Sequence, residues 1–248
     1  MRRVFPVFER RAIVVSAEVY DESMSEHHSH SIPHWHRRSA GEHRVPVLIV
    51  VLIVIALQFL LPDRLSMKFQ SEICVLEGLL LLGLLVTSPG RISKHRVEVR
   101  TLGIVLTSVM TLSNIASLFL LIRLLMTSGI SSPNELLLSG GSIWLANVVV
   151  FSLWFWELDR GGPGARAEAR ELHPDFYFPQ MQDPALGGSK WEPNYFDYLY
   201  TSFTNASAFS PTDVLPLTRM AKMLMMIQSM ISLMTIGLVV ARAVNILR

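Results

Sequence analysis

The sequence predicts an all-α integral membrane protein with five transmembrane helices and one re-entrant half-helix that leads into a pore-like loop. Half of the 248 residues are hydrophobic and only 17% are charged, whereas soluble domains carry about 25% charged residues. The hydrophobic residues are grouped into long blocks, and a bilayer core of ~30 Å requires about 20 such residues in a helix. Because the blocks do not alternate between polar and apolar residues, they are not typical of barrel strands.

Five blocks are long enough to be spans, and residues that favour helix ends flank several of them. Pro46 suits the first turn of the first helix, and Pro89 with Gly90 ends the second. Trp154 and Trp156 form an aromatic anchor near the end of the fourth, where a helix meets the membrane surface. The predicted spans are 45–61, 72–88, 101–126, 142–158 and 217–247.

The spans divide the chain into four regions. A polar tail that contains His and Arg covers 1–44 and lacks helical periodicity, so we expect it to be partly disordered. A four-helix transmembrane region covers 45–158, in which 127–140 is a short connection with almost no charge. A Gly/Pro-rich polar loop covers 159–194, and a pore-like half-helix, loop and last transmembrane helix cover 195–248.

The distribution of Lys and Arg predicts a cytoplasmic N-terminus in a bacterial inner membrane. The tail carries seven of these residues, the connection between the second and third spans four, and the loop 159–194 four. If four spans cross, these regions share one side, and fifteen positive residues stand against Arg64 and Lys68 on the other. Positively charged segments stay in the cytoplasm, so residues 195–216 enter the membrane from inside. The same distribution fits both re-entry of 195–216 and a sixth crossing by this segment. Re-entry places the C-terminus outside, and a sixth crossing places it inside.

The stretch FDYLYTSFTNASAFSPTDVLPLTRMAK and the apolar block after it form a short aromatic segment, a polar loop and a long helix. This layout resembles the pore module of tetrameric cation channels. The resemblance implies a pore helix at 195–206, a filter position at 207–212, and the aspartate of the module at Asp213. It also implies a basic residue at Arg219, a hinge at Gly237 and four subunits around one axis, because each chain offers a single loop.

The filter position departs from that of potassium channels, which carry TVGYG where this chain has SAFSPT. Glycines permit the left-handed backbone angles that point successive carbonyls at the axis, whereas Pro211 fixes φ at about −65°. We therefore expect a wider hydrated path that prefers monovalent cations, because hydroxyl groups and an acidic ring attract them. The alternative is a turn that leads into the last helix within a non-conducting packing element. The pore- and filter-like residues are Thr204, Asn205, Ser207, Ala208, Phe209, Ser210, Pro211, Thr212 and Asp213.

Polar residues inside the predicted spans are candidates for function because lipid disfavours them. Gln228, Ser232 and Thr235 share one face of the last helix, where they line a water path or form hydrogen bonds to neighbouring helices. Gly237 together with Ala241 favours close helix packing or, alternatively, a gating hinge. In the other spans the topology allows an ion pair between Glu77 and Arg123. The intramembrane polar residues there are Glu77, Asn114, Arg123 and Asn147.

The N-terminal tail holds a histidine cluster, EHHSHSIPHWH. Neutral imidazoles bind zinc, nickel or copper, and His-rich tracts also respond to pH. The spacing matches no defined zinc site, so the alternatives are weak metal binding, a pH response and an incidental solvated tail. The residues concerned are His27, His28, His30, His34 and His36.

Motifs for catalysis do not occur: the chain has no nucleophile elbow, no zinc-protease helix and no phosphate loop. We therefore expect no enzyme and no cofactor. A net charge of only +2 gives no nucleic-acid footprint.

The leading hypothesis is an ion-channel-like protein that forms a homo-oligomer in the lipid bilayer. The alternatives are a non-conducting scaffold or regulatory subunit, and a small-molecule transporter that uses Glu77, Asn114 and Asn147. The stretch WELDRGGP at 156–163 also resembles a motif of an uncharacterised bacterial membrane-protein family. That second resemblance covers the whole chain and implies no established activity.

Overall fold

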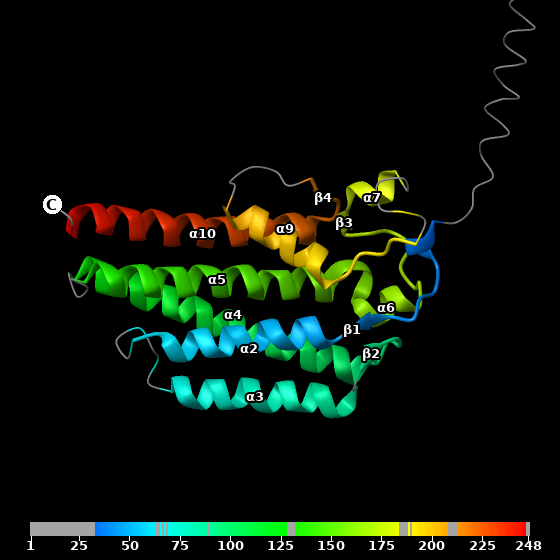
Figure 1. Cartoon of the computed structure of the whole chain (residues 1–248), viewed down its shortest axis with the longest axis horizontal. Coiled ribbons are helices and arrows are strands. Elements are labelled where there is room, and N and C mark those ends of the chain that lie inside the picture. The colour runs from blue at the N-terminus through cyan, green and yellow to red at the C-terminus, as the bar shows by residue number, and fades with distance from the viewer. Residues whose placement is uncertain are drawn as a thin grey trace, which may run out of the picture. The chain divides into compact units, whose positions relative to one another are not determined.

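The computed structural model describes residues 33–62, 65, 67, 69–88, 90–127, 132–183, 188, 190–207 and 213–246. From His34 onward the chain forms one compact unit. Six helices of more than one or two turns run through the described part of this unit (Figure 1). They are α2 (Val45–Leu60), α3 (Gln70–Thr87), α4 (Val97–Met126), α5 (Pro133–Leu158), α9 (Tyr195–Ser207) and α10 (Arg219–Ile246).

Helix α5 lies at the centre of the bundle, where it contacts α2, α4, α9 and α10, while α3 packs on α2 and α4 (Figure 1). The short elements gather at one end of the bundle, which we call the loop end. They are η1 (His34–His36), β1 (Glu42–His43), β2 (Arg91–Ile92), η3 (Asp159–Gly161), α6 (Pro163–Ala167), β3 (Phe176–Tyr177), α7 (Pro179–Gln182) and β4 (Leu215–Pro216).

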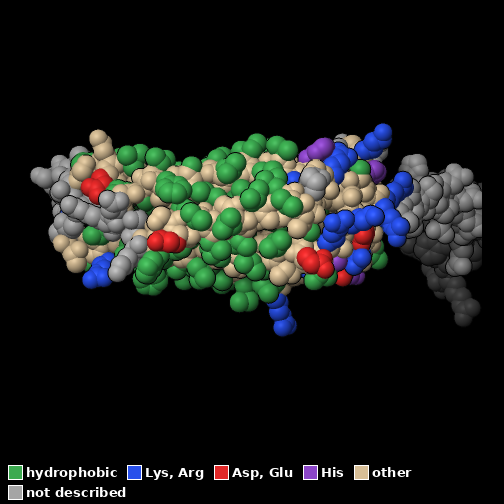
Figure 2. All heavy atoms as spheres, turned by 90° about the horizontal axis from the view of Figure 1, so that it is seen from below, with side chains coloured by type: hydrophobic (Ala, Val, Ile, Leu, Met, Phe, Trp, Pro, Cys, Tyr) green, Lys and Arg blue, Asp and Glu red, His purple; other side chains and the backbone are tan. Residues whose placement is uncertain are grey.

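Four of the described helices are long and apolar enough to cross a membrane. These candidate spans are Gln70–Thr87, Val97–Met126, Pro133–Gly161 and Arg219–Val244, and a shorter apolar helix covers Val45–Leu60. Figure 2 shows hydrophobic side chains over the middle of one face, and most Lys, Arg and His side chains near the loop end. The chain is therefore mostly helical and has the composition of an all-α membrane protein, with four candidate spans and a shorter fifth helix.

Helix α5 begins much earlier than predicted, so the expected connection over 127–140 is wrong beyond residue 132. Ser132 caps the helix by accepting a hydrogen bond from the Glu135 N–H, and Pro133 occupies the first turn. Gly140 and Gly141 both lie within the helix. A Cβ at Gly140 would come within 2.3 Å of Val239 on α10, so this glycine permits close approach of the two helices.

Two segments expected to be irregular are ordered where the structure describes them. The end of the tail forms β1, which pairs antiparallel with β2, so the polar tail is not disordered from His34 onward. The predicted loop 159–194 contains η3, α6, β3 and α7, and β3 pairs antiparallel with β4 just ahead of α10. Both pairings join segments that are far apart in sequence, and local composition does not reveal such contacts.

Candidate functional site: the half-helix α9 and its anchors

Helix α9 contains 13 residues, about half the length of α5 and α10. Its first turns contact the loop end, where the Tyr198 hydroxyl donates to Asp159 at 2.6 Å. The chain is back at the loop end before α10 begins, because the Leu217 N–H donates to the Asp175 carbonyl at 2.8 Å and Thr218 donates to the Asp175 carboxylate at 2.7 Å. The residues directly ahead of α10 therefore lie at the end of the bundle from which α9 starts (Figure 1).

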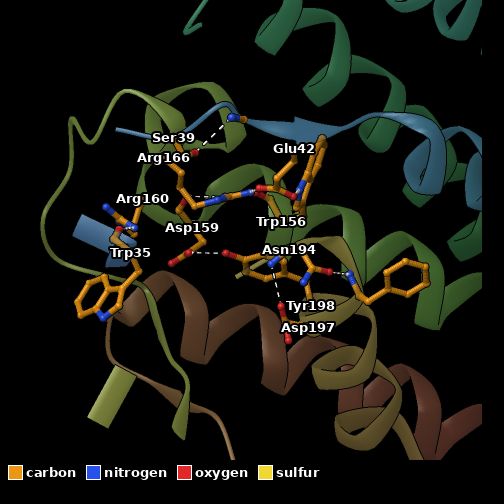
Figure 3. Close-up of polar contacts among 12 residues, drawn as sticks. Trp35, Ser39, Glu42, Trp156, Asp159, Arg160, Arg166, Asn194, Asp197 and Tyr198 are labelled. Carbon is orange, nitrogen blue, oxygen red and sulfur yellow. Dashed lines mark hydrogen bonds and ion pairs between the residues drawn. The ribbon is translucent and has the colours of Figure 1, made fainter. Parts of the chain in front are cut away.

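Asp159 joins three parts of the chain at this point, as Figure 3 shows for the Tyr198 contact. Its carboxylate is fully buried and accepts from Tyr198 on α9 and from the backbone N–H groups of Asp175 and Phe176 at 2.8 and 3.2 Å. Asp175 in turn holds the start of α10. One carboxylate therefore fixes the end of α5, the first half of α9 and the entry to α10.

Arg166 supports this hub from α6 (Figure 3). Its guanidinium donates to the carbonyls of Trp156 and Asp159 at 2.7 and 2.9 Å and forms an ion pair with Glu42 at 2.7 Å. Burial lowers the pKa of Arg166, but Tyr198, Glu42 and Asp159 raise it, and the balance is a raised pKa. The guanidinium therefore stays charged and links α5, α6 and the N-terminal segment.

Arg160 makes the corresponding link to the start of the described chain. The residue lies at φ 51°, and glycines follow it at positions 161 and 162 with φ of 77° and 94°, which side chains rarely tolerate. This sharp turn directs the guanidinium to the carbonyls of Trp35 at 2.7 Å and Glu171 at 2.8 Å. The stretch WELDRGGP thus folds into a buried anchor at the end of α5.

A second, deeper network joins α9 to α5 and α10. Gln228 is fully buried on α10 and donates to the Ser202 carbonyl and hydroxyl at 2.9 and 2.6 Å, while Asn205 donates to the Gln228 side-chain oxygen at 2.8 Å. Asn147 on α5 donates to the Gln228 carbonyl and to Ser232 at 3.3 and 2.9 Å. Of the two interpretations of the polar face of α10, helix–helix hydrogen bonding is the one these contacts match.

The other predicted pore residues have local partners or lie outside the described chain. Thr204 and Ser207 donate to carbonyls one turn earlier in α9, at 2.9 and 2.7 Å. Asp213 is exposed, whereas 208–212, the predicted filter, lies outside the described residues. On α10, Thr235 is buried and donates to the Ile231 carbonyl, and no atom lies within 4 Å of a Cβ built at Gly237.

The predicted intramembrane polar residues divide between separate places. Gln58 donates to both carboxylate oxygens of Glu77 at 3.1 Å, so Glu77 has an amide as its partner and forms no ion pair with Arg123 among the described residues. Arg123 is exposed on α4. Asn114 is buried on the same helix, whereas Asn147 belongs to the network with Gln228.

The histidine cluster is described only in part. His34 lies 3.0 Å from Glu192, and His36 donates to the Leu172 carbonyl at 2.9 Å. His27, His28 and His30 lie outside the described residues. Within the described part of the chain, no group of three or more His, Cys, Asp or Glu side chains is placed to hold a metal ion.

Sequence reasoning missed the anchor residues Asp159, Arg166 and Tyr198 and the amide partner Gln58. Asp159 and Arg166 lie in a charged, Gly-rich segment that looks solvated, and only their burial and their contacts with Tyr198 show that they bear on α9. A usable signal was present in the sequence: charged residues directly follow an apolar span that ends in aromatic residues, and two glycines come next.

Comparison with known proteins gives no match: no protein-family model, curated protein or solved structure matches this chain. The candidate site is therefore defined by its own geometry. Its core is a half-length helix held at its start by Asp159 and near its end by Gln228.

Proposed function

We propose that this protein is ion-channel-like, with α9, the loop after it and α10 as the pore module of one subunit in a homotetramer. The observation that carries the proposal is the course of the chain: a half-length helix leaves the loop end, and the chain returns to that end before a full-length helix begins. At a rise of ~1.5 Å per residue the 13 residues of α9 extend about 20 Å, less than the ~30 Å of a bilayer core.

The polarity of α9 is favourable for a cation path. A helix carries about half a negative charge at its C-terminal end, and in α9 this end precedes the predicted filter. Hydroxyl groups and the exposed carboxylate of Asp213 add to the attraction for cations. A hydrated path without a carbonyl cage then accepts monovalent cations with weak discrimination between them.

The two networks around α9 give such a loop a rigid support. Tyr198 is bound to Asp159 at one end of the helix, and Asn205 is bound to Gln228 at the other. Since these bonds occupy the polar face of α10 within one chain, the path is lined by the loop rather than by Gln228 and its neighbours. The Lys and Arg residues at the loop end make this end the cytoplasmic side of a bacterial inner membrane.

A non-conducting scaffold or regulatory subunit is the second candidate, and one observation favours it. The polar side chains of α10 that were expected on a water path, Gln228, Ser232 and Thr235, are all buried inside the chain. Bonds of this kind hold packed helices together and keep these side chains off a water path. The transporter alternative has less support, because Glu77 and Asn147 bond to different partners and form no common site.

Cation flux through liposomes containing the purified full chain tests the proposal. We expect potassium and sodium to pass, and Asp213→Asn to reduce the preference for cations over anions, because the variant removes an acidic ring. Glu171→Gln is the matched control, since Glu171 is an exposed carboxylate at the same end of the bundle outside the pore module. Absence of flux, or equal effects of the two variants, would favour the scaffold.

A further inference from the structure

The loop end contains a cavity whose charged lining is mostly basic. Arg44 precedes α2, Lys94 and Arg96 precede α4, and Arg100 lies in the first turns of α4. Glu157 near the end of α5 is the acidic lining residue. The cavity thus combines four permanent positive charges with one carboxylate, at the end of the bundle where Figure 2 shows Lys and Arg gathered.

The basic side chains of this cavity outnumber its one carboxylate, Glu157, which interacts electrostatically with Arg100 and Arg44. Among the described residues, none of these three side chains forms a direct ion pair. The Nε of Arg100 is buried and has no hydrogen-bond partner in the described chain. Arg96 caps α4 without a side-chain hydrogen bond to its first turn, so the positive end of the helix dipole adds to the local field.

The cavity wall is built by close backbone contacts. A Cβ at Gly164 would lie 2.5 Å from the Lys94 carbonyl oxygen and 2.9 Å from the His95 Cα. A Cβ at Gly162 would lie 3.8 Å from the Arg100 Nε. These glycines hold the segment before α4 against the turn after α5, which fixes the spacing of the basic side chains.

A second cavity lies deeper, between α2, α3, α4 and α5. Most of its lining is apolar, including Val51, Leu81 and Leu106. Arg44 and Glu157 line both cavities, so the basic cavity and the apolar one meet at these two side chains. Together they place basic side chains beside an apolar chamber. The basic side chains match the charged headgroup of an anionic amphiphile, and the apolar chamber matches its hydrocarbon.

We propose that this pair of cavities is a binding site for an anionic phospholipid, with the phosphate between Arg44, Lys94, Arg96 and Arg100 and hydrocarbon in the chamber below. Basic pockets between transmembrane helices on the cytoplasmic side bind lipid headgroups in this way. The bound lipid joins α2, α4 and α5, the helices that carry the anchor of α9. The site does not depend on conduction, and its test uses binding alone.

The test measures lipid binding to the delipidated full chain in a nonionic detergent by native mass spectrometry. The probes are dioleoyl phosphatidylglycerol, dioleoyl phosphatidylcholine and inorganic phosphate. Arg100→Gln removes a side chain whose Nε has no hydrogen-bond partner in the described chain, and Arg123→Gln is the matched control at the other end of the same helix. Leu106→Phe reduces the chamber alone, and unfolding temperatures of the delipidated variants verify that each is folded.

We expect phosphatidylglycerol to bind at least about tenfold more tightly than phosphatidylcholine, and Arg100→Gln to weaken phosphatidylglycerol binding about fivefold. The triple replacement of Lys94, Arg96 and Arg100 by Gln should weaken it roughly a hundredfold. Arg123→Gln should have no effect, and Leu106→Phe should weaken lipid binding while leaving phosphate binding unchanged. Equal affinity for the two lipids, or equal effects of Arg100→Gln and Arg123→Gln, would overturn the proposal. Phosphate that binds as tightly as the lipid would also overturn it, since the ligand would then be a soluble anion.

Discussion

Three tyrosines of α9 provide a test of how the half-helix is held. Replacing each with Phe removes one oxygen atom and leaves the ring in place. Tyr198 is fully buried and donates to the Asp159 carboxylate. Tyr195 is buried and shares a hydrogen bond of 2.6 Å with the Ser152 hydroxyl. Tyr200 is 53% exposed and serves as the control on the same helix.

The structure orders the three losses. A hydrogen bond to a charged group contributes about 1.5–3 kcal/mol to stability, and one between neutral groups about 1 kcal/mol. We therefore expect Tyr198→Phe to lower the free energy of unfolding by about 2 kcal/mol and Tyr195→Phe by about 1 kcal/mol. Tyr200→Phe should stay within about 0.5 kcal/mol of the unchanged protein, as exposed substitutions usually do.

Unfolding by sodium dodecyl sulfate in mixed micelles, followed by tryptophan fluorescence and by helical circular dichroism, gives these differences. Equal losses for Tyr198→Phe and Tyr200→Phe would refute the role of Asp159 as the anchor of α9. The support for a rigid pore loop would then fall to the Gln228 network alone.

Two further predictions concern the contacts of α10. Gly140→Ala should destabilise the protein by about 1–3 kcal/mol, because its Cβ meets Val239 and overpacks the interface. The Cβ of Gly141→Ala meets no atom within 4 Å, so this variant should stabilise α5 by up to about 1 kcal/mol. Thermal unfolding compares the two variants, and a change of the same sign in both would contradict the close packing of the helices. Gln228→Met keeps the side-chain size but removes three hydrogen bonds, each worth about 0.6 kcal/mol in membranes. We therefore expect the free energy of unfolding to fall by about 2 kcal/mol in the same assay. An unchanged stability with altered ion flux would instead place Gln228 on a water path.

The apolar spans and the half-helix could be predicted because they depend on local sequence. Long apolar blocks form helices in a membrane protein regardless of their neighbours, since no other structure satisfies the backbone in lipid. The predicted pore helix at 195–206 differs by one residue from the observed Tyr195–Ser207. The start of α5 was not predictable in this way, because Gly140 serves packing against a helix that is distant in sequence.

The sequence by itself determined that this chain is mostly helical, with long apolar helices that suit a membrane and a short polar-faced helix ahead of the last long one. Composition and block length suffice for that, because the bilayer imposes the same demand on every segment. Only the tertiary structure decided which polar groups meet: Asp159 with Tyr198, Gln228 with Asn205, and the arginines around the basic cavity. These contacts join distant segments, and their energies depend on burial and on distances of a few ångströms, which exist only once the helices have packed.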